Sequence, residues 1–194
     1  MTDTWSATLE DFRTSLVAAG RSASTRRLRT MYARLFAEST DAAPSAVTLS
    51  DLEAFLGSRP DWKPATREVV TACLRNLFGW MQRTGRRADN PAADLPRVLV
   101  PRGLPRPCPD AAIMDALAAV PAREALMIRL GGELGLRRAE IATVRGDALA
   151  VSVDGWTLTV TGKGGKTRRV PVDDDTLAAE ILERGQGWTF PGRT

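Results

Sequence analysis

The chain has 194 residues, of which 43% are hydrophobic and 26% charged, and a net charge of +4 carried mostly by arginine. This composition is globular, is long enough for one large domain or two small ones, and includes no apolar run near the roughly 20 residues of a membrane span. Without histidine, and with two distant cysteines, Cys73 and Cys108, the chain has too few soft ligands for zinc, so we expect neither a metal nor another cofactor.

The first residues lack the basic and apolar segments of a secretion signal, which predicts a cytoplasmic location and no membrane partner. The abundance of arginine suits forked contacts to phosphate groups. A GC-rich coding sequence produces the same bias, so composition alone leaves nucleic-acid binding open.

Four amphipathic helices are predicted before residue 86. Apolar residues recur at helical spacing over 5–19 and over 63–84. Two further helical patterns start at polar residues that are expected to cap them: one begins at the cluster 22–25, and the other has Ser50 as its cap. The four segments predict a compact all-α domain, residues 1–85. The polar face of the second helix carries Arg26, Arg27, Arg29 and Arg34.

Prolines and arginines then alternate over residues 86–108. So many prolines exclude a helix and indicate an interdomain linker. A basic linker is suited to lie along a phosphate backbone, and an ordinary semi-rigid spacer is the equally open alternative.

The remaining residues, 109–194, predict an α+β domain. Helical patterns cover 109–120, 123–134 and 137–144, and a last helix is expected over 174–184. Between them, alternating apolar residues predict strands at 148–153, 156–160 and 168–172. Because apolar residues follow the last helix without a closing element, this domain is expected to be incomplete.

An arginine box follows Gly135, which is expected to end a helix. Arg137 then lies in the first turn of the next helix, where free backbone amides favour an anion and a guanidinium can grip a phosphate with two parallel hydrogen bonds. Glu140 falls on the same helical face within reach of Arg137. The alternative is a helix-start arginine paired with a surface glutamate.

A glycine-rich turn, residues 162–166, joins the last two predicted strands. Its glycines allow Lys163, Lys166 and Arg168 to approach a backbone closely. The turn is not a nucleotide-binding loop, because that motif needs glycine where Val160 stands and a helix where a strand follows. A solvated cationic turn is the alternative, and no nucleotide is expected as a ligand.

Taken together, the arginine box and the lysine hairpin resemble the catalytic domain of tyrosine recombinases and phage integrases. The front part, with Tyr32 and Phe36 after the cluster at 22–25, with Trp62 through Trp80, and with the exit at 90–92, is similar to the helical core-binding domain of that family. The resemblance covers nearly the whole chain. It implies a mainly α fold with a small antiparallel β-sheet: a four-helix, SAM-like core-binding domain, followed by an incomplete α+β catalytic domain.

The resemblance also implies chemistry without metal or nucleotide, in which a tyrosine attacks a phosphodiester and forms a 3′-phosphotyrosine. Arg137 matches the arginine that binds the scissile phosphate and stabilises the charge of the transition state. Glu140 matches the acidic position that supports it, and Lys163 matches the general acid that protonates the leaving 5′ hydroxyl.

Double-stranded DNA at an attachment or recombination site is the implied partner, gripped by both domains, with self-association on DNA possible. Most of the contacts should be to phosphates and therefore sensitive to salt. The residues expected to make them are Arg26, Arg27, Arg29, Lys63, Thr66, Arg67, Thr71, Arg75, Arg138, Lys166 and Arg168.

The sequence departs from the family pattern in lacking histidine and in having a single tyrosine, Tyr32, at an apolar position of a predicted helix. We therefore expect a C-terminally truncated integrase that binds DNA but does not cut it. Two alternatives stay open: a short form that works as a DNA-binding competitor or regulator of recombination, and an unrelated helical transcription factor with a β-rich effector domain.

Overall fold

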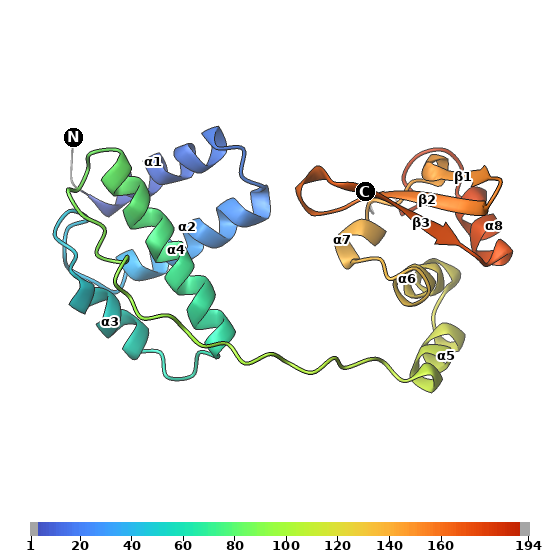
Figure 1. Ribbon diagram of the computed structural model, residues 1–194, viewed down its shortest axis with the longest axis horizontal. Coiled ribbons are helices and arrows are strands. Elements are labelled where there is room, and N and C mark those ends of the chain that lie inside the picture. Colours follow the sequence, from blue (N-terminus) through green and yellow to red (C-terminus); the bar gives the residue numbers. More distant parts are fainter. Residues whose placement is uncertain (1–3, 191–194) are drawn as a thin grey trace. The chain divides into compact units, whose positions relative to one another are not determined.

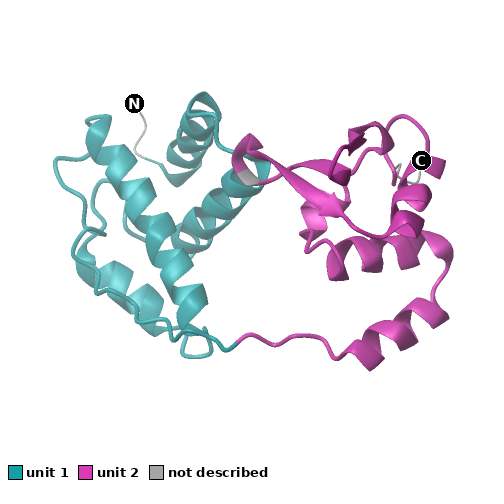
Figure 2. Cartoon of the chain, turned by 45° about the vertical axis from the view of Figure 1, so that its right-hand side comes forward, with its two compact units in different colours: residues 1–104 teal, residues 105–194 magenta. Residues whose placement is uncertain are grey.

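The structure is a computed structural model that describes residues 4–190, apart from the side chain of Lys163. The chain divides into two compact units, unit 1 up to Leu104 and unit 2 from Pro105 (Figure 1, Figure 2). Each unit has its own hydrophobic core. Within the described residues, no helix is long and apolar enough to cross a membrane.

Unit 1 consists of four helices, as the apolar spacing predicts. Side-chain oxygens cap three of them: Thr4 and Ser22 accept backbone N–H groups at the first two helix starts, and Thr48 forms a reciprocal capping box with Asp51. The fourth begins with Pro64, which suits the first helical position. The helices are α1 (Trp5–Ala18), α2 (Ala23–Ala37), α3 (Leu49–Gly57) and α4 (Pro64–Arg83).

Aromatic side chains fill the core of unit 1. Phe12, Phe36 and Phe78 are fully buried, and Trp5 lies edge-on to both Phe36 and Phe78, with ring centroids 5.6 and 6.5 Å apart. Such edge-to-face pairs stabilise a core beyond the area they bury. Helix α4 supplies more buried residues than any other helix of the unit, so the surface that it leaves free is narrow.

The predicted linker does not begin at residue 86. Arg87 is anchored there by hydrogen bonds to the carbonyls of Pro44 and Val47, and Ala92 and Leu95 are buried in the core of unit 1. The segment up to Leu95 therefore packs as part of unit 1. Its arginines serve that packing because buried carbonyl oxygens need donors.

Unit 2 combines four helices with a three-stranded sheet, which confirms the predicted α+β pattern. Gly132 and Ile141 end two of the helices earlier than the apolar pattern suggests. The α-helices are α5 (Asp110–Ala119), α6 (Ala122–Gly132), α7 (Arg138–Ile141) and α8 (Asp175–Glu183), and the strands are β1 (Leu149–Ser152), β2 (Gly155–Thr161) and β3 (Thr167–Val172). Two short 3-10 helical turns, η1 (Gly146–Ala148) and η2 (Lys163–Gly165), lie before β1 and before β3.

The sheet is an antiparallel meander in the order β1-β2-β3. In its register Leu158 lies opposite Leu149 and Val170, and Val160 lies opposite Arg168. Alternation places Leu158 and Val160 on the inner face, where they join the core with apolar residues of α6 and α8 (Figure 1). The sheet thus carries the turn at 162–166 out from a packed platform.

An ion-pair cluster joins α6 to α8. The Arg129 guanidinium binds Glu133, the residue just after the end of α6, and it also binds Asp174 and Glu180, at the start of α8 and within it. Its side chain is only 14% exposed, so these carboxylates compensate a partly buried charge. The periodicity of α6 does not indicate this role, because the partners are distant in sequence.

Candidate nucleic-acid interface

The arginine box begins where α6 ends. Gly135 has a φ of +62°, a left-handed conformation that favours glycine, and the Leu136 N–H donates to the Leu130 carbonyl at 3.2 Å. This closing bond reverses the chain after α6. Arg137 follows as the extended residue just before α7, one position ahead of the first helical turn in which the sequence predicts it.

Glu140 is the centre of the box. Its side chain is only 2% exposed, and it accepts the backbone N–H of Arg137 at 2.8 Å and the Arg137 Nη1 at 3.0 Å. From β3, Arg168 donates Nη1 to Oε1 at 2.6 Å and Nη2 to Oε2 at 3.1 Å. The carboxylate therefore joins α7 to the start of β3, next to the glycine-rich turn.

The same contacts favour the ionised form of Glu140. The hydrogen bonds from Arg168, followed by the Arg137 backbone N–H, lower the pKa of Glu140 from 4.5 to about 2, because each stabilises the charged carboxylate. Glu140 is thus a fixed negative charge between two guanidinium groups. It holds the arginines and is not a group that exchanges protons near neutral pH.

With respect to the described residues, Arg137 keeps most of its donors free. Its side chain is 73% exposed and contacts Glu140 through one guanidinium nitrogen, whereas a guanidinium has five N–H donors. The remaining donors face solvent. This arrangement is suited to an oxyanion such as a phosphate group, which arginine binds with two parallel hydrogen bonds.

The glycine-rich turn lies directly against Glu140. Gly164 and Gly165 have φ values of +78° and +74°, and the Gly162 N–H donates to the Lys166 carbonyl at 2.7 Å. A Cβ atom at Gly162 would lie 2.9 Å from Glu140 Oε1, so only glycine permits this approach. The structure therefore brings the arginine box and the hairpin together; the Lys163 side chain lies outside the described residues.

The two arginines at the start of β3 point to opposite faces of the sheet. Arg168 pairs with the buried Val160 and shares the inner face, while Arg169 pairs with Thr159 on the outer face and is exposed. Arg168, which is predicted to contact DNA, is instead bound to Glu140. Its alternation in phase with Val170 and Val172 is the sequence signal that indicates this inward orientation.

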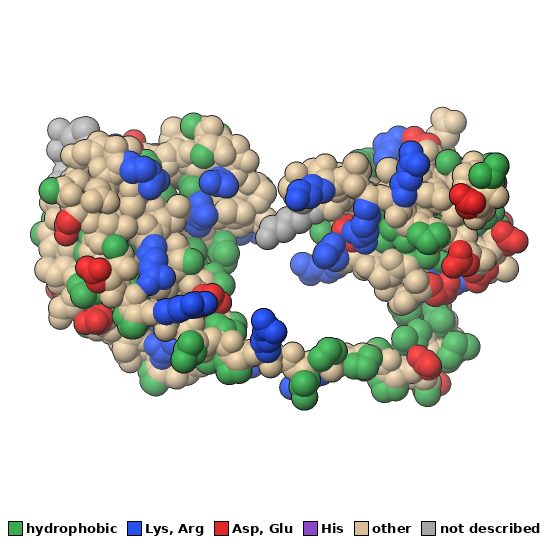
Figure 3. Space-filling view, in the orientation of Figure 1, with side chains coloured by type: hydrophobic (Ala, Val, Ile, Leu, Met, Phe, Trp, Pro, Cys, Tyr) green, Lys and Arg blue, Asp and Glu red, His purple; other side chains and the backbone are tan. Residues whose placement is uncertain are grey.

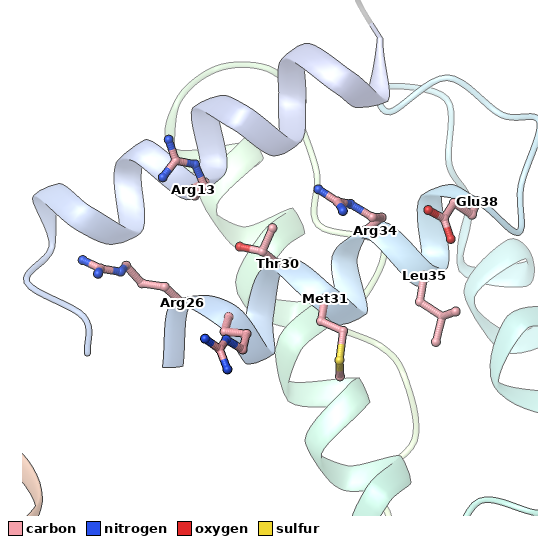
Figure 4. A pocket seen from close by; sticks show the side chains of 8 residues that line it. Arg13, Arg26, Thr30, Met31, Arg34, Leu35 and Glu38 are labelled. Atoms are coloured by element: carbon pink, nitrogen blue, oxygen red, sulfur yellow. The ribbon is translucent and has the colours of Figure 1, made fainter. Parts of the chain in front are cut away.

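In unit 1, α2 presents cations along an open groove of about 560 Å³ that is lined mostly by residues of α2, with Arg13 contributed by α1 (Figure 4). Arg26, Arg27 and Arg34 line it together with the apolar Met31, which is 48% exposed. Arg29 lies near Cys73 of α4 instead. Burial raises the pKa of the Cys73 thiol, and the positive charge of Arg29 offsets part of that increase. The predicted arginine face of α2 is thus divided between two sides of the helix.

Helix α4 offers less to DNA than the sequence predicts. Lys63 is exposed and Thr66 half-buried at its first turn. Thr71 is 2% exposed, so the prediction that it contacts DNA is wrong. Thr71 lies on the side of α4 that faces the core, next to the buried Val70 and Leu74.

Two arginines of α4 are occupied within unit 1. Arg67 donates to the carbonyls of Leu56, Arg59 and Trp62, and Arg75 donates to those of Ala92 and Leu95. These bonds satisfy carbonyl oxygens in the last turn of α3 and in irregular segments. The two guanidinium groups therefore hold neighbouring loops rather than facing outward for DNA.

Charge is unevenly distributed over unit 2. Figure 3 shows Lys and Arg side chains gathered on one side of this unit and most Asp and Glu side chains on the other. Arg138 and Lys166 are exposed, whereas the start of α8 carries Asp173, Asp174 and Asp175. No group of three or more His, Cys, Asp or Glu side chains in the described part of the chain is arranged to hold a metal ion.

Known proteins with similar sequences are tyrosine recombinases, although no protein-family model matches the chain. XerC of Erythrobacter litoralis is 30% identical over 206 aligned positions, which cover 97% of this chain and 66% of that protein. XerD of Xanthomonas campestris pv. campestris is 33% identical over 122 positions, or 59% of this chain and 37% of that protein. The chain thus spans only part of the length of these relatives.

Solved structures show the same fold. A lambda integrase tetramer bound to a Holliday junction matches with a TM-score of 0.74 at 20% identity, over 94% of this chain and 56% of that one. XerH bound to its difH substrate matches with a TM-score of 0.60 at 16% identity, over 86% and 52%. A helical unit followed by this α+β unit is therefore an integrase-type fold.

The chain belongs to the tyrosine recombinase family, which includes the phage integrases. Its sequence relatives and its fold lead to the same family as the arginine box and hairpin do. The alternative of an unrelated transcription factor is therefore wrong.

Acid should weaken unit 2 through Glu140. Because its folded-state pKa of about 2 lies below the ordinary value of 4.5, the stability that the ionised carboxylate contributes is present above about pH 4.5 and is lost as the pH falls toward about 2. We expect the difference in unfolding midpoint between wild type and Glu140→Gln to shrink over this window. Urea unfolding at pH 7, 5, 4, 3 and 2 measures it, with Glu53→Gln as an exposed control.

A constant difference between wild type and Glu140→Gln from pH 7 to pH 2 would contradict the ionised bridge. Equal midpoints of the two proteins above pH 5 would contradict it as well. Glu140 is ionised there in both the folded and the unfolded state, so its stabilising contribution should be fully present.

Proposed function

We propose that this chain binds attachment-site DNA as the DNA-gripping part of a phage-type site-specific tyrosine recombinase, with Arg137 as a ligand of a backbone phosphate. One observation carries the proposal: Glu140 holds Arg137 with most of its donors free, beside a glycine turn that carries lysines. A guanidinium held in this way stabilises the charge that develops on a phosphate under attack.

In the full-length form, we propose, such a site cuts and rejoins DNA through a 3′-phosphotyrosine. Arg137 binds the scissile phosphate, Glu140 supports it, and Lys163 protonates the leaving 5′ hydroxyl. Further DNA contacts are proposed for residues on α2, at the start of α4 and in unit 2. They are Arg26, Arg27, Arg29, Lys63, Thr66, Arg138 and Lys166. Self-association on DNA stays a prediction.

The 194 residues themselves are proposed to bind DNA without cutting it. Their only tyrosine, Tyr32, packs edge-on against Trp62 in unit 1, with the two ring centroids 6.2 Å apart. They contain no histidine. The same observation favours a second candidate function, a DNA-binding competitor or regulator that occupies recombination sites without cleavage.

Replacing Arg137 tests the proposal. We expect Arg137→Gln to weaken binding to a duplex attachment site about tenfold, since a charge-assisted hydrogen bond to phosphate is lost. Fluorescence anisotropy at low salt measures the affinity. Arg184→Gln removes the same charge from an exposed residue at the end of α8 and serves as the matched control.

Equal affinities of wild type and Arg137→Gln would contradict the phosphate-binding role. Covalent trapping on a nicked attachment site tests the second part, and a phosphotyrosyl adduct formed by the 194-residue chain would contradict the absence of cleavage.

A further inference from the structure

One carboxylate is shared by two arginines from different elements. Both oxygens of Glu140 receive a donor from Arg168 and a donor from Arg137, but Arg168 contributes two side-chain nitrogens and Arg137 only one. A forked pair of this kind is the stronger and geometrically more specific of the two contacts. Arg168 is therefore the principal side-chain anchor of Glu140.

Arg168 is placed for this role by the strand register. It lies on the inner face opposite Val160, and its side chain is 39% exposed, against 73% for Arg137. Most of the surface that Arg137 offers to a ligand is thus turned away from the core, whereas the Arg168 guanidinium is committed to the carboxylate.

Gly162 closes the third side of the carboxylate. Because a Cβ atom at this position would lie 2.9 Å from Oε1, the backbone of the turn rests on Glu140 with no space between them. The position of Glu140 is therefore defined by α7, by β3 and by the turn at once. A displacement of the carboxylate moves the arginine box relative to the hairpin.

We infer that Arg168 is a positioning residue: by holding Glu140 in a forked pair, it keeps the carboxylate from pairing fully with Arg137 and so leaves the Arg137 donors free for a DNA phosphate. A carboxylate that loses one forked partner is able to take the neighbouring guanidinium in the same geometry. Without Arg168, Glu140 withdraws Arg137 from the ligand. This inference rests on the proposed function.

A double-mutant cycle tests the inference in the full 194-residue chain. Affinity for the duplex attachment site is measured by anisotropy for wild type, Arg168→Gln, Arg137→Gln and the double variant. We expect Arg168→Gln to lose about as much affinity as Arg137→Gln, roughly tenfold, and the double variant to lose no more than either single variant within about twofold.

The matched control is Arg169→Gln, which removes the same charge from the outer face of the same strand. Its effect is expected to multiply with that of Arg137→Gln, since the two residues share no partner in the described part of the chain. Arg168→Lys is the conservative variant; it keeps the charge without the fork, so we expect it not to restore wild-type affinity.

A spectroscopic measurement accompanies the cycle and does not depend on DNA. Carbon-13 NMR of the Glu140 carboxyl group should show its titration moved to higher pH in Arg168→Gln and unmoved in Arg169→Gln. Gly162→Ala, which keeps every charge but crowds Oε1, should also weaken binding. It replaces Arg168→Gln in the affinity comparison if that variant fails to fold.

The possible outcomes separate the two proposals. Losses that multiply between Arg168→Gln and Arg137→Gln, or full affinity in Arg168→Lys, would overturn the positioning role and leave the proposed function standing. Absence of DNA binding by the wild-type chain, or wild-type affinity in Arg137→Gln, would overturn the proposed function and with it the inference.

Discussion

The affinity of this chain for duplex DNA is expected to fall about a thousandfold when the salt concentration rises from 50 to 200 mM. The reason is the release of counterions from each phosphate that a cation neutralises. Among the described residues, six predicted contact cations have neither an ion-pair partner nor a side-chain hydrogen bond. They are Arg26, Arg27, Arg29, Lys63, Arg138 and Lys166.

Single substitutions should show which cations contribute. Each neutralised phosphate adds about −0.9 to the slope of log affinity against log salt, so Arg26→Gln should reduce that slope by about this amount. Arg67→Gln is the matched control, because its guanidinium is bound to three carbonyls of unit 1. We expect it to leave the slope unchanged and to lower the unfolding midpoint instead.

Anisotropy titrations at four or more salt concentrations measure the slopes. An affinity that hardly changes between 50 and 200 mM salt would contradict a phosphate-dominated interface. An equal change of slope in Arg67→Gln and Arg26→Gln would contradict the division between structural and free arginines.

Leu158→Ala is expected to destabilise unit 2 by about 2–5 kcal/mol, the usual cost of removing a large buried aliphatic side chain. Leu158 is fully buried at the centre of the sheet and packs in one cluster with residues of α6 and α8. Since β2 carries the glycine turn and β3 carries Arg168, loss of the platform should also separate the hairpin from Glu140.

Amide hydrogen exchange distinguishes the two units in one experiment. Protection should fall in the paired residues of β2 and β3 and stay at the wild-type level in α4, which belongs to the separate core of unit 1. Val153→Ala, at a fully exposed position in the turn between β1 and β2, is the control and should change stability by less than about 0.5 kcal/mol. Loss of protection in both units would contradict their independence.

Much of the fold was predictable because local pattern determines it. The helical spacing of apolar residues, the cap in the cluster at 22–25 and the alternation of the strands each act within a few residues along the chain. The cap predicted at Ser50 was wrong, because Thr48 caps α3 through its capping box with Asp51. The family was predictable for a similar reason, since the arginine box and the glycine turn are short motifs. Neither prediction needs knowledge of distant partners.

The partners of the arginines were not predictable in this way. Arginine is a long side chain with five donors, and its charge does not indicate whether it faces a phosphate or a carbonyl. Arg67, Arg75 and Arg87 bond to carbonyls that only the folded chain places beside them. For that reason the prediction that Arg67 and Arg75 contact DNA exceeded what the structure offers.

The sequence by itself determined the helices, the strands, the box and the hairpin of this protein, because these depend on neighbouring residues. Only the tertiary structure decided that Glu140 binds Arg168 as well as Arg137, and that Gly162 rests on the carboxylate. The physical reason is that α7 and β3 are distant in the chain and meet through packing of the sheet on its helices. Among the described residues, the buried carboxylate takes as its partners the two guanidinium groups and a backbone amide.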